Sequence, residues 1–345
     1  MACGFDAGTY HLVCCKRDKD NNFVYKKEIN AFIEIPITAD RMVFNMMKNA
    51  KNEQGTPCVP LIEWKEKGVA FALGEAAVNI AYTMGQLSLK RPMTRGCLNP
   101  KEKNSQQIMS IMMHSLVEDC SPNEPLYYSV PSNAVNENTD ADYHSLVLKA
   151  IFDGFEDDNG NKVSANPINE GLALVYAELA KKAYTGLGIS FGAGMVNLCF
   201  AIFGSPVFSF SLVNSGDWID AQAASATGET IAVINQEKRK LDMTADSDNM
   251  IQRAIKAQYQ IMIQKTVTGI KKGLEEAGNK IRTNDPIDVV IAGGTSMPVG
   301  FDKAFAAAIR GANLPIQIGS VVRPADPLYS VARGCLLAAE ASAQN

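Results

Sequence analysis

Short apolar strands alternate with amphipathic helices in both halves of this chain. Apolar runs at residues 2–5 and 10–15 flank a polar turn near the start, and similar runs at 186–202 and 206–213 flank Gly-rich turns in the middle. The clearest helix is expected at residues 250–278, where apolar side chains recur every three or four positions. This alternation predicts an α/β protein in which helices cover two sheets, with the second half echoing the first.

The other elements are predicted from the same two periods. A strand at 69–74 leads into a helix that ends near 84, a long helix is expected from Pro100 to about 117, and a buried strand at 126–131 precedes a helix at 140–152. In the second half we expect a strand at 287–292 and another at 316–322, with helices at 216–228, 231–241, 299–312 and 327–343. No repeat of about 20–50 residues is visible, which argues against a solenoid.

Length and charge narrow the class of protein. At 345 residues the chain exceeds the size at which one hydrophobic core keeps growing, so two domains are expected. The net charge of −4 and the absence of a basic cluster predict no direct binding to nucleic acid.

Cysteine usage and hydropathy point to a compartment. The eight cysteines contain no C-x-x-C pair and only three histidines are present, so no zinc site is expected. No secretory signal and no membrane-spanning run is visible. A reduced, cytoplasmic protein is the simplest interpretation.

The first turn has the composition of an anion site. Gly8 lets the backbone approach a phosphate closely, and the successive amides of Gly8, Thr9, Tyr10 and His11 can form an anion-binding nest. Asp6 ends an apolar strand, where a carboxylate can hold a hydrated Mg²⁺ ion. The alternative is a plain hairpin turn that Asp6 caps. For His11, phosphate contact and packing against a neighbouring loop are both open.

Three further segments have similar chemistry. Residues 186–194 contain four glycines between apolar runs, which suits a second phosphate hairpin, although an ordinary β-turn explains them too. Gly293 and Gly294 follow an apolar strand and precede a helix, where adenosine or phosphate can meet a helix N-terminus. Glu170 precedes a helix and can orient the water that attacks a terminal phosphate, or serve only as a partner of the helix dipole.

Taken in order, these segments resemble the motifs of the actin / DnaK-type ATPase superfamily over almost the whole chain. Residues 5–13 and 190–198 resemble its two phosphate motifs, 168–173 and 326–339 its two connecting motifs, and 289–298 its adenosine motif. Within the superfamily, residues 91–98, 215–220 and 326–334 are most similar to bacterial actins of the MreB and MamK kind.

The resemblance implies a two-lobed actin-like fold of duplicated RNase H-like domains around a cleft for ATP (or GTP) and Mg²⁺. Domain I would span residues 1–170, with a smaller subdomain at about 30–85, and would be completed by a helix at 327–345. Domain II would span 171–326, with a smaller subdomain at about 217–285.

The resemblance also assigns roles to single residues. Asp6 and Glu170 would be catalytic, and Asp6 would hold Mg²⁺ through water. The nucleotide would be contacted by Gly8, Thr9, Tyr10, His11, Gly192, Ala193, Gly194, Gly216, Asp217, Lys238, Gly293, Gly294, Thr295 and Met297. Lys238 stands here for the adenine-side Glu/Lys pair within residues 237–240.

The implied function is ATP-dependent polymerisation into a cytoskeletal filament, with other copies of the chain and an unidentified cargo or adaptor protein as partners. Two alternatives stay open. One is a nucleotide-binding scaffold that forms no filaments, and the other is a small-molecule kinase of the same fold.

The chain departs from the superfamily pattern where water and metal are organised. Ser190 stands where an aspartate is usual, Met195 where threonine is usual, Asn197 in place of a frequent aspartate, and Gly171 in place of a proline. Losing one such transition-state contact costs about 2–4 kcal/mol, or roughly 100- to 1000-fold in rate. The sequence therefore predicts retained nucleotide binding with slow hydrolysis.

Overall fold

Two five-stranded mixed sheets form the centre of the protein. The computed structural model describes residues 2–37, 41–55, 57–58, 60–84, 88–117, 124–156, 162–281 and 285–343. The first sheet has the order β10-β9-β1-β2-β3, and its strands are β1 (Cys3–Ala7), β2 (His11–Arg17), β3 (Phe23–Ile29), β9 (Pro125–Val130) and β10 (Ser164–Asn169). The second has the order β13-β12-β11-β14-β15, and its strands are β11 (Gly186–Phe191), β12 (Val196–Ile202), β13 (Ser205–Leu212), β14 (Ile287–Ala292) and β15 (Ile318–Val322).

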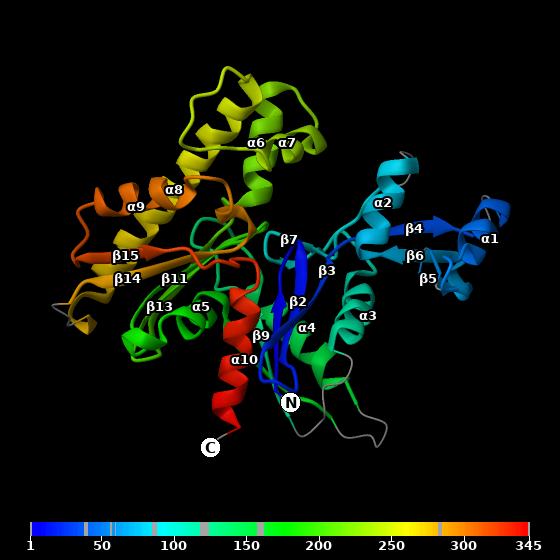
Figure 1. The fold of residues 1–345 in the computed structure, drawn as a ribbon, viewed down its shortest axis with the longest axis horizontal. Coiled ribbons are helices and arrows are strands. Elements are labelled where there is room, and N and C mark those ends of the chain that lie inside the picture. Colours follow the sequence, from blue (N-terminus) through cyan, green and yellow to red (C-terminus); the bar gives the residue numbers. More distant parts are fainter. Residues whose placement is uncertain are drawn as a thin grey trace.

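The two sheets have the same topology. In each, three consecutive strands form an antiparallel meander, and two later strands add in parallel beside its first strand. The predicted α/β layers and the echo between the halves are confirmed. We call the parts built on the two sheets the first lobe and the second lobe (Figure 1).

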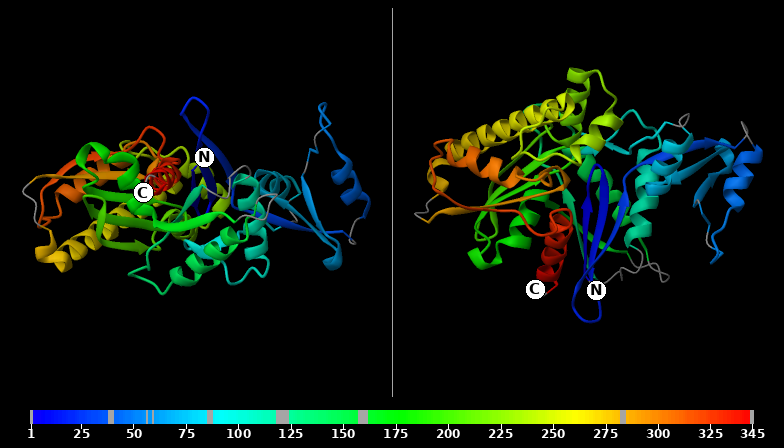
Figure 2. Two further views of the ribbon diagram at one scale, coloured as in Figure 1. Left: turned by 90° about the horizontal axis from the view of Figure 1, so that it is seen from below. Right: turned by 45° about the horizontal axis from the view of Figure 1, so that its top comes forward.

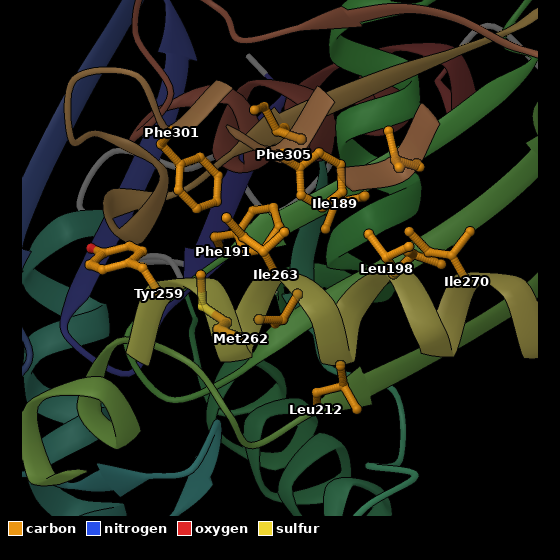
Figure 3. Packing of buried hydrophobic residues seen from close by; sticks show 14 of the residues in the cluster. Ile189, Phe191, Leu198, Leu212, Tyr259, Met262, Ile263, Ile270, Phe301 and Phe305 are labelled. Atoms are coloured by element: carbon orange, nitrogen blue, oxygen red, sulfur yellow. The ribbon is translucent and has the colours of Figure 1, made fainter. Parts of the chain in front are cut away.

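Each lobe has its own hydrophobic core. In the second lobe, α8 (Met250–Ala277) and α9 (Phe301–Arg310) pack on the sheet, and Figure 3 shows Phe191, Ile263 and Phe301 meeting between them. In the first lobe, α3 (Ser105–Val117) and α4 (Ala141–Asp153) bury their apolar faces against the other sheet. Burying a large apolar side chain contributes about 1.5–3 kcal/mol, so these helices are held mainly by packing.

Smaller units extend from both lobes. In the first, the strands β4 (Phe32–Pro36), β6 (Val69–Leu73) and β5 (Leu61–Trp64) form a three-stranded sheet with α1 (Arg41–Asn49) and α2 (Gly74–Met84). In the second, α6 (Gly216–Thr227) and α7 (Ile231–Lys238) pack on α8. Figure 2 places the three-stranded sheet at one end of the molecule and the α8–α9 region at the other. The predicted domain boundaries stay predictions.

Two helices connect the lobes. The helix α5 (Glu170–Glu178) follows β10 directly and packs against β11 and β12, while α10 (Ser330–Ser342) returns from the end of the chain to pack on β1, β2 and α5. Their contact is close because Gly334 has no side chain: a Cβ atom there would lie 1.8 Å from the carbonyl oxygen of Ala173.

Replacing Gly334 with alanine is therefore expected to destabilise the fold. The clash is with backbone rather than with a flexible side chain, so α10 has to shift, and overpacking of this kind costs about 1–3 kcal/mol. Chemical denaturation of Gly334→Ala measures the loss. The control Ala341→Ser, at an exposed position of the same helix, should change stability by less than about 0.5 kcal/mol. An unchanged denaturation midpoint for Gly334→Ala would contradict the prediction.

The lobes also touch along β13. Ala134 and Ser211 form an isolated parallel bridge, and Asn136 donates its amide to Asn214 at 2.6 Å. Ser132 and Ser209 share a hydroxyl–hydroxyl hydrogen bond of 2.9 Å. These contacts join the segment that precedes α4 in the first lobe to the second lobe.

Two expected boundaries are wrong. The helix predicted from Pro100 begins at Ser105, because residues 101–105 form turns whose amides bond to Asn99 and Glu102. The closing helix begins at Ser330 rather than at 327, because Tyr329 first closes a turn onto the carbonyl of Asp326. Among the described residues, no helix combines the length and hydropathy that crossing a membrane requires.

Candidate functional site

Two hairpin turns face each other between the lobes. The first turn, residues 8–10, joins β1 to β2, and the second turn, residues 192–195, joins β11 to β12. A Cβ atom built on Gly194 would lie 2.4 Å from the Thr9 hydroxyl oxygen and 2.4 Å from the amide nitrogen of Gly96. Only glycine fits there, so the turns lie in direct contact across the gap between the lobes.

The first turn is held by a residue outside the motif. Asn30, which is fully buried, donates its side-chain amide to the carbonyl of Gly8 at 3.0 Å and its backbone N–H to that of Tyr10 at 2.8 Å. A Cβ atom on Gly8 would lie 2.5 Å from the carbonyl oxygen of His11, so the turn is too tight for a side chain. No local pattern pointed to Asn30, because it lies beyond β3.

The second turn is where three distant segments converge. The carbonyl of Gly192 accepts hydrogen bonds from the Ser215 hydroxyl at 2.6 Å, the Thr295 hydroxyl at 2.7 Å and the Gly216 amide at 3.3 Å. The Asp217 amide donates to the carbonyl of Ala193 at 2.8 Å. The start of α6 and the turn after β14 are thereby fixed against the second turn.

The Gly-Gly turn after β14 leaves room for a ligand. Gly293 adopts a φ of +89° and donates its N–H to the carbonyl of Pro327 at 2.9 Å, which ties the turn to the approach of α10. A Cβ atom at Gly294 would meet nothing within 4 Å. Met297, in the same segment, is exposed, and Arg323 donates to its carbonyl and to those of its two neighbours.

A pair of carboxylates lies beside the turns. Asp6, near the end of β1, accepts a hydrogen bond of 2.8 Å from the Ser129 hydroxyl. Glu170, the first residue of α5, accepts hydrogen bonds from the side chains of Ser190 and Asn197 in the second lobe. Both carboxylates are half-buried, and they interact electrostatically with each other.

The two carboxyl groups hold a proton more tightly than usual. Burial, and then repulsion from Asp6, raises the pKa of Glu170 to about 8. Burial raises the pKa of Asp6 to about 6, although the hydrogen bond from Ser129 opposes the shift. Two carboxylates that disfavour each other's charge need a proton or a cation nearby. Oxygen donors of this kind suit a hydrated Mg²⁺ ion, which takes one or two carboxylates and keeps several waters.

The departures from the superfamily pattern at Met195 and Asn197, in and just after the second turn, have structural reasons. Asn197 accepts a hydrogen bond from Ser211 on its amide oxygen, so its amide nitrogen is left to donate to Glu170. Met195 is 1% exposed and packs with Cys97 and Ala141 of the first lobe, where it works as an apolar contact between the lobes.

Gly171 is required by packing. A Cβ atom there would lie 2.3 Å from the amide nitrogen of Cys199 and 2.8 Å from the carbonyl oxygen of Gly188. The first turn of α5 therefore presses on two strands of the second sheet and has no space for a proline ring. The preceding residue, Asn169, caps the helix by accepting hydrogen bonds from the amides of Gly171 and Leu172.

The other predicted site residues are placed as follows. Lys238 forms an ion pair of 2.5 Å with Asp220 and reaches the carbonyl of Gly216, so its charge is already neutralised. Tyr10 and His11 meet edge to face with ring centres 4.7 Å apart. Burial, together with the cations Lys27, Arg239 and Arg91, lowers the pKa of His11 to about 4, so this ring is neutral at pH 7 and adds no positive charge.

Comparison with known proteins gives the same architecture. No curated protein matches the chain in sequence. A solved structure described as a MamK double helical filament matches with a TM-score of 0.68 at 14% identity, covering 98% of both chains. A non-polymerising mutant of MamK bound to AMPPNP matches with a TM-score of 0.56 at 16% identity, again over 98% of both. At these identities the likeness shows the fold alone, and that fold is actin-like.

The sequence itself matches one family model over nearly its full length. The model is that of Volactin, and it covers residues 1–339. The matched range includes both turns, the carboxylate pair and all but the end of α10. The chain is therefore a member of the Volactin family, with an actin-like fold.

Proposed function

We propose that this protein binds ATP with Mg²⁺ between its lobes, polymerises into a filament when the nucleotide is bound, and hydrolyses the nucleotide slowly. The observation that carries the proposal is the carboxylate pair Asp6 and Glu170 beside two turns that touch at Thr9 and Gly194. The fold it shares with a MamK filament, and with a MamK mutant bound to AMPPNP, supports both parts of the proposal.

In the proposed complex each group has a limited task. The backbone amides of the two turns bind phosphate oxygens, and the Gly293–Gly294 turn leaves space for the adenosine. Bound Mg²⁺ would neutralise phosphate charge, and Asp6 would hold it through water. Glu170 would orient the attacking water, with Ser190 and Asn197 fixing its carboxylate. Phosphoryl transfer depends on such positioning and charge neutralisation more than on covalent chemistry.

We also propose that the filament forms in the cytoplasm, with an adaptor or cargo protein as a further partner. Seven cysteines are free thiols in the described structure and six of these are buried, as expected in a reducing compartment. Self-association through unlike surfaces that do not close a ring produces filaments.

Electron microscopy and sedimentation test polymerisation directly. The protein is incubated with Mg-ATP, with Mg-AMPPNP, with Mg-ADP or without nucleotide. Filaments that need a nucleoside triphosphate are expected, and they should persist longest with AMPPNP, which is not hydrolysed. Binding of AMPPNP without any assembly would favour the scaffold alternative. Failure to bind any nucleotide would contradict the whole proposal.

Ser190→Asp tests the proposed cause of slow hydrolysis. The new carboxylate would lie where Ser190 now donates to Glu170, adding an acidic group that can organise Mg²⁺ and water. Phosphate release with saturating Mg-ATP is expected to increase, by up to roughly 100-fold. Without nucleotide the variant should unfold at lower temperature, because a third carboxylate is then uncompensated. Ser190→Asn, which adds similar bulk without charge, is the matched control and should not accelerate release.

A further inference from the structure

Neither phosphate turn supplies a positive charge. Residues 6–11 and 190–197 contain no lysine or arginine, and the His11 ring is neutral at pH 7. Amides and one Mg²⁺ ion leave part of a triphosphate's charge unbalanced. A cation from elsewhere in the chain is therefore expected near the turns.

Arg91 lies where such a cation is needed. Its Nη1 atom donates to both carboxylate oxygens of Asp217, at 2.9 and 2.8 Å. Its guanidinium carbon lies 4.9 Å from the centre of the Tyr10 ring, in the first turn. The Asp217 amide in turn donates to Ala193, in the second turn. Arg91 thus belongs to the first lobe, pairs with the second, and lies beside both turns.

The guanidinium of Arg91 is only partly used. Asp217 engages Nη1 alone, so the pair lacks the parallel two-bond geometry that arginine and carboxylates favour. Among the described residues, neither its Nη2 amino group nor its Nε–H has a hydrogen-bond partner. The Arg91 side chain is half-buried, with 29% exposure. The side-chain amide of Asn99 donates a hydrogen bond of 3.2 Å to the backbone carbonyl of Arg91. An anchored guanidinium with spare donors beside two phosphate turns has the chemistry of a phosphate ligand.

The other cations near the turns do not combine an anchored position beside both turns with spare hydrogen-bond donors. Lys238 is neutralised by Asp220, and Lys27 and Arg239 are exposed residues that affect His11 only through their charge. Arg95, four residues after Arg91, is 62% exposed and pairs with Glu137 of its own lobe. Of these cations, Arg91 alone is linked to both turns. It lies over the Tyr10 ring of the first turn and pairs with Asp217, whose amide donates to Ala193 of the second.

We propose that Arg91 binds a phosphate oxygen of the nucleoside triphosphate through Nη2 and Nε while Nη1 stays on Asp217, and so couples phosphate binding to the ion pair that joins the lobes. The inference rests on the proposed function, because it assigns a ligand contact within the same nucleotide site. It implies that Asp217 has a positioning role, since its carboxylate orients the guanidinium and does not touch phosphate.

A pair of variants separates phosphate binding from a purely structural ion pair. Arg91→Gln and Asp217→Asn both break the ion pair, but only the first removes the cation. Isothermal titration calorimetry with Mg-AMPPNP measures the affinity of each. Loss of a charge-assisted hydrogen bond predicts roughly 10- to 100-fold weaker binding for Arg91→Gln. Asp217→Asn is expected to bind at least about tenfold more tightly than Arg91→Gln, and Arg91→Lys should recover part of the loss.

Controls make the outcomes distinct. Arg95→Gln removes an arginine from the same segment and should bind Mg-AMPPNP as the unmodified protein does, and thermal unfolding of each variant shows that it is folded. Equal losses for Arg91→Gln and Asp217→Asn, or no loss for Arg91→Gln, would overturn the role of Arg91 while leaving the nucleotide site intact. Absence of binding by the unmodified protein would instead reject the proposed function, and this inference with it.

Discussion

Replacing Glu170 with glutamine is expected to lower the rate of ATP hydrolysis by roughly 100- to 1000-fold while nucleotide binding is retained. Glutamine keeps the size of the side chain and can still hydrogen-bond to Ser190 and Asn197, but it cannot orient water as a carboxylate does. Single-turnover phosphate release measures the loss, and calorimetry with Mg-AMPPNP measures binding. Filaments of the variant should therefore persist in ATP.

The same substitution is expected to stabilise the free protein at alkaline pH. A carboxyl group whose pKa rises on folding, from 4.5 to about 8 for Glu170, binds more protons in the folded state than in the unfolded state within this range. The free energy of unfolding therefore falls as pH rises from about 4.5 to 8. Glu170→Gln removes that penalty, on the order of 1–2 kcal/mol at pH 8 after allowance for partial exposure.

Thermal unfolding at pH 5 and pH 8 checks this sign. The unmodified protein should lose stability relative to Glu170→Gln as pH increases, and the difference should be much smaller at pH 5 than at pH 8. The control is Glu178→Gln at the other end of α5, which removes the ion pair with Arg333 and should destabilise rather than stabilise. A Glu170→Gln variant that is less stable at pH 8 would show that this carboxyl carries no electrostatic penalty.

Replacing Gly194 with alanine is expected to weaken binding of Mg-AMPPNP by roughly 10- to 100-fold. The added methyl group would lie 2.4 Å from both the Thr9 hydroxyl oxygen and the Gly96 amide nitrogen, so the two turns have to move apart. A triphosphate held from both sides would then lose contacts on one of them. Small-angle scattering should show a larger radius of gyration for the variant with nucleotide bound.

The matched control is Gly154→Ala, at the end of α4. A Cβ atom there would lie 3.3 Å from the nearest carbonyl oxygen, which a small adjustment accommodates, so nucleotide affinity should not change. Unaltered affinity and dimensions for Gly194→Ala would mean that the contact between Thr9 and Gly194 is not part of the binding geometry. That result would remove a main support of the proposed function.

Much of the secondary structure was predictable because its signals are local. The apolar spacing of α8 and the apolar run of β14 specify a helix and a strand within single segments, and the predicted ranges of 250–278 and 287–292 agree closely with the structure. Boundaries failed where side chains capture amides in turns, as Asn99 does before α3. The glycine turns were recognisable too, because only glycine permits the close approaches at Gly8 and Gly194.

The supporting residues of the site had no such local signal. Ser129 bonds to Asp6 across 123 positions of the chain, and Arg91 pairs with Asp217 across 126. A serine in a strand or an arginine before a proline is unremarkable until the fold brings it to its partner. The reason for the departures from the superfamily pattern could not be predicted from sequence either. At Met195 the sequence showed only that the usual threonine hydroxyl is absent, whereas the structure shows its side chain packed between the lobes.

From its residue order alone, the chain specifies two similar α/β halves, a pair of glycine turns and one acidic residue, Asp6, directly before the first of them. Hydrophobic periodicity and turn composition are properties of short stretches of chain, so these features can be predicted without coordinates. Folding adds what depends on distance between remote segments. The shared burial of Asp6 and Glu170 raises their pKa values, and the contact of Thr9 with Gly194 brings the lobes together. Electrostatic and packing energies depend on separation in space, which chain order does not encode directly.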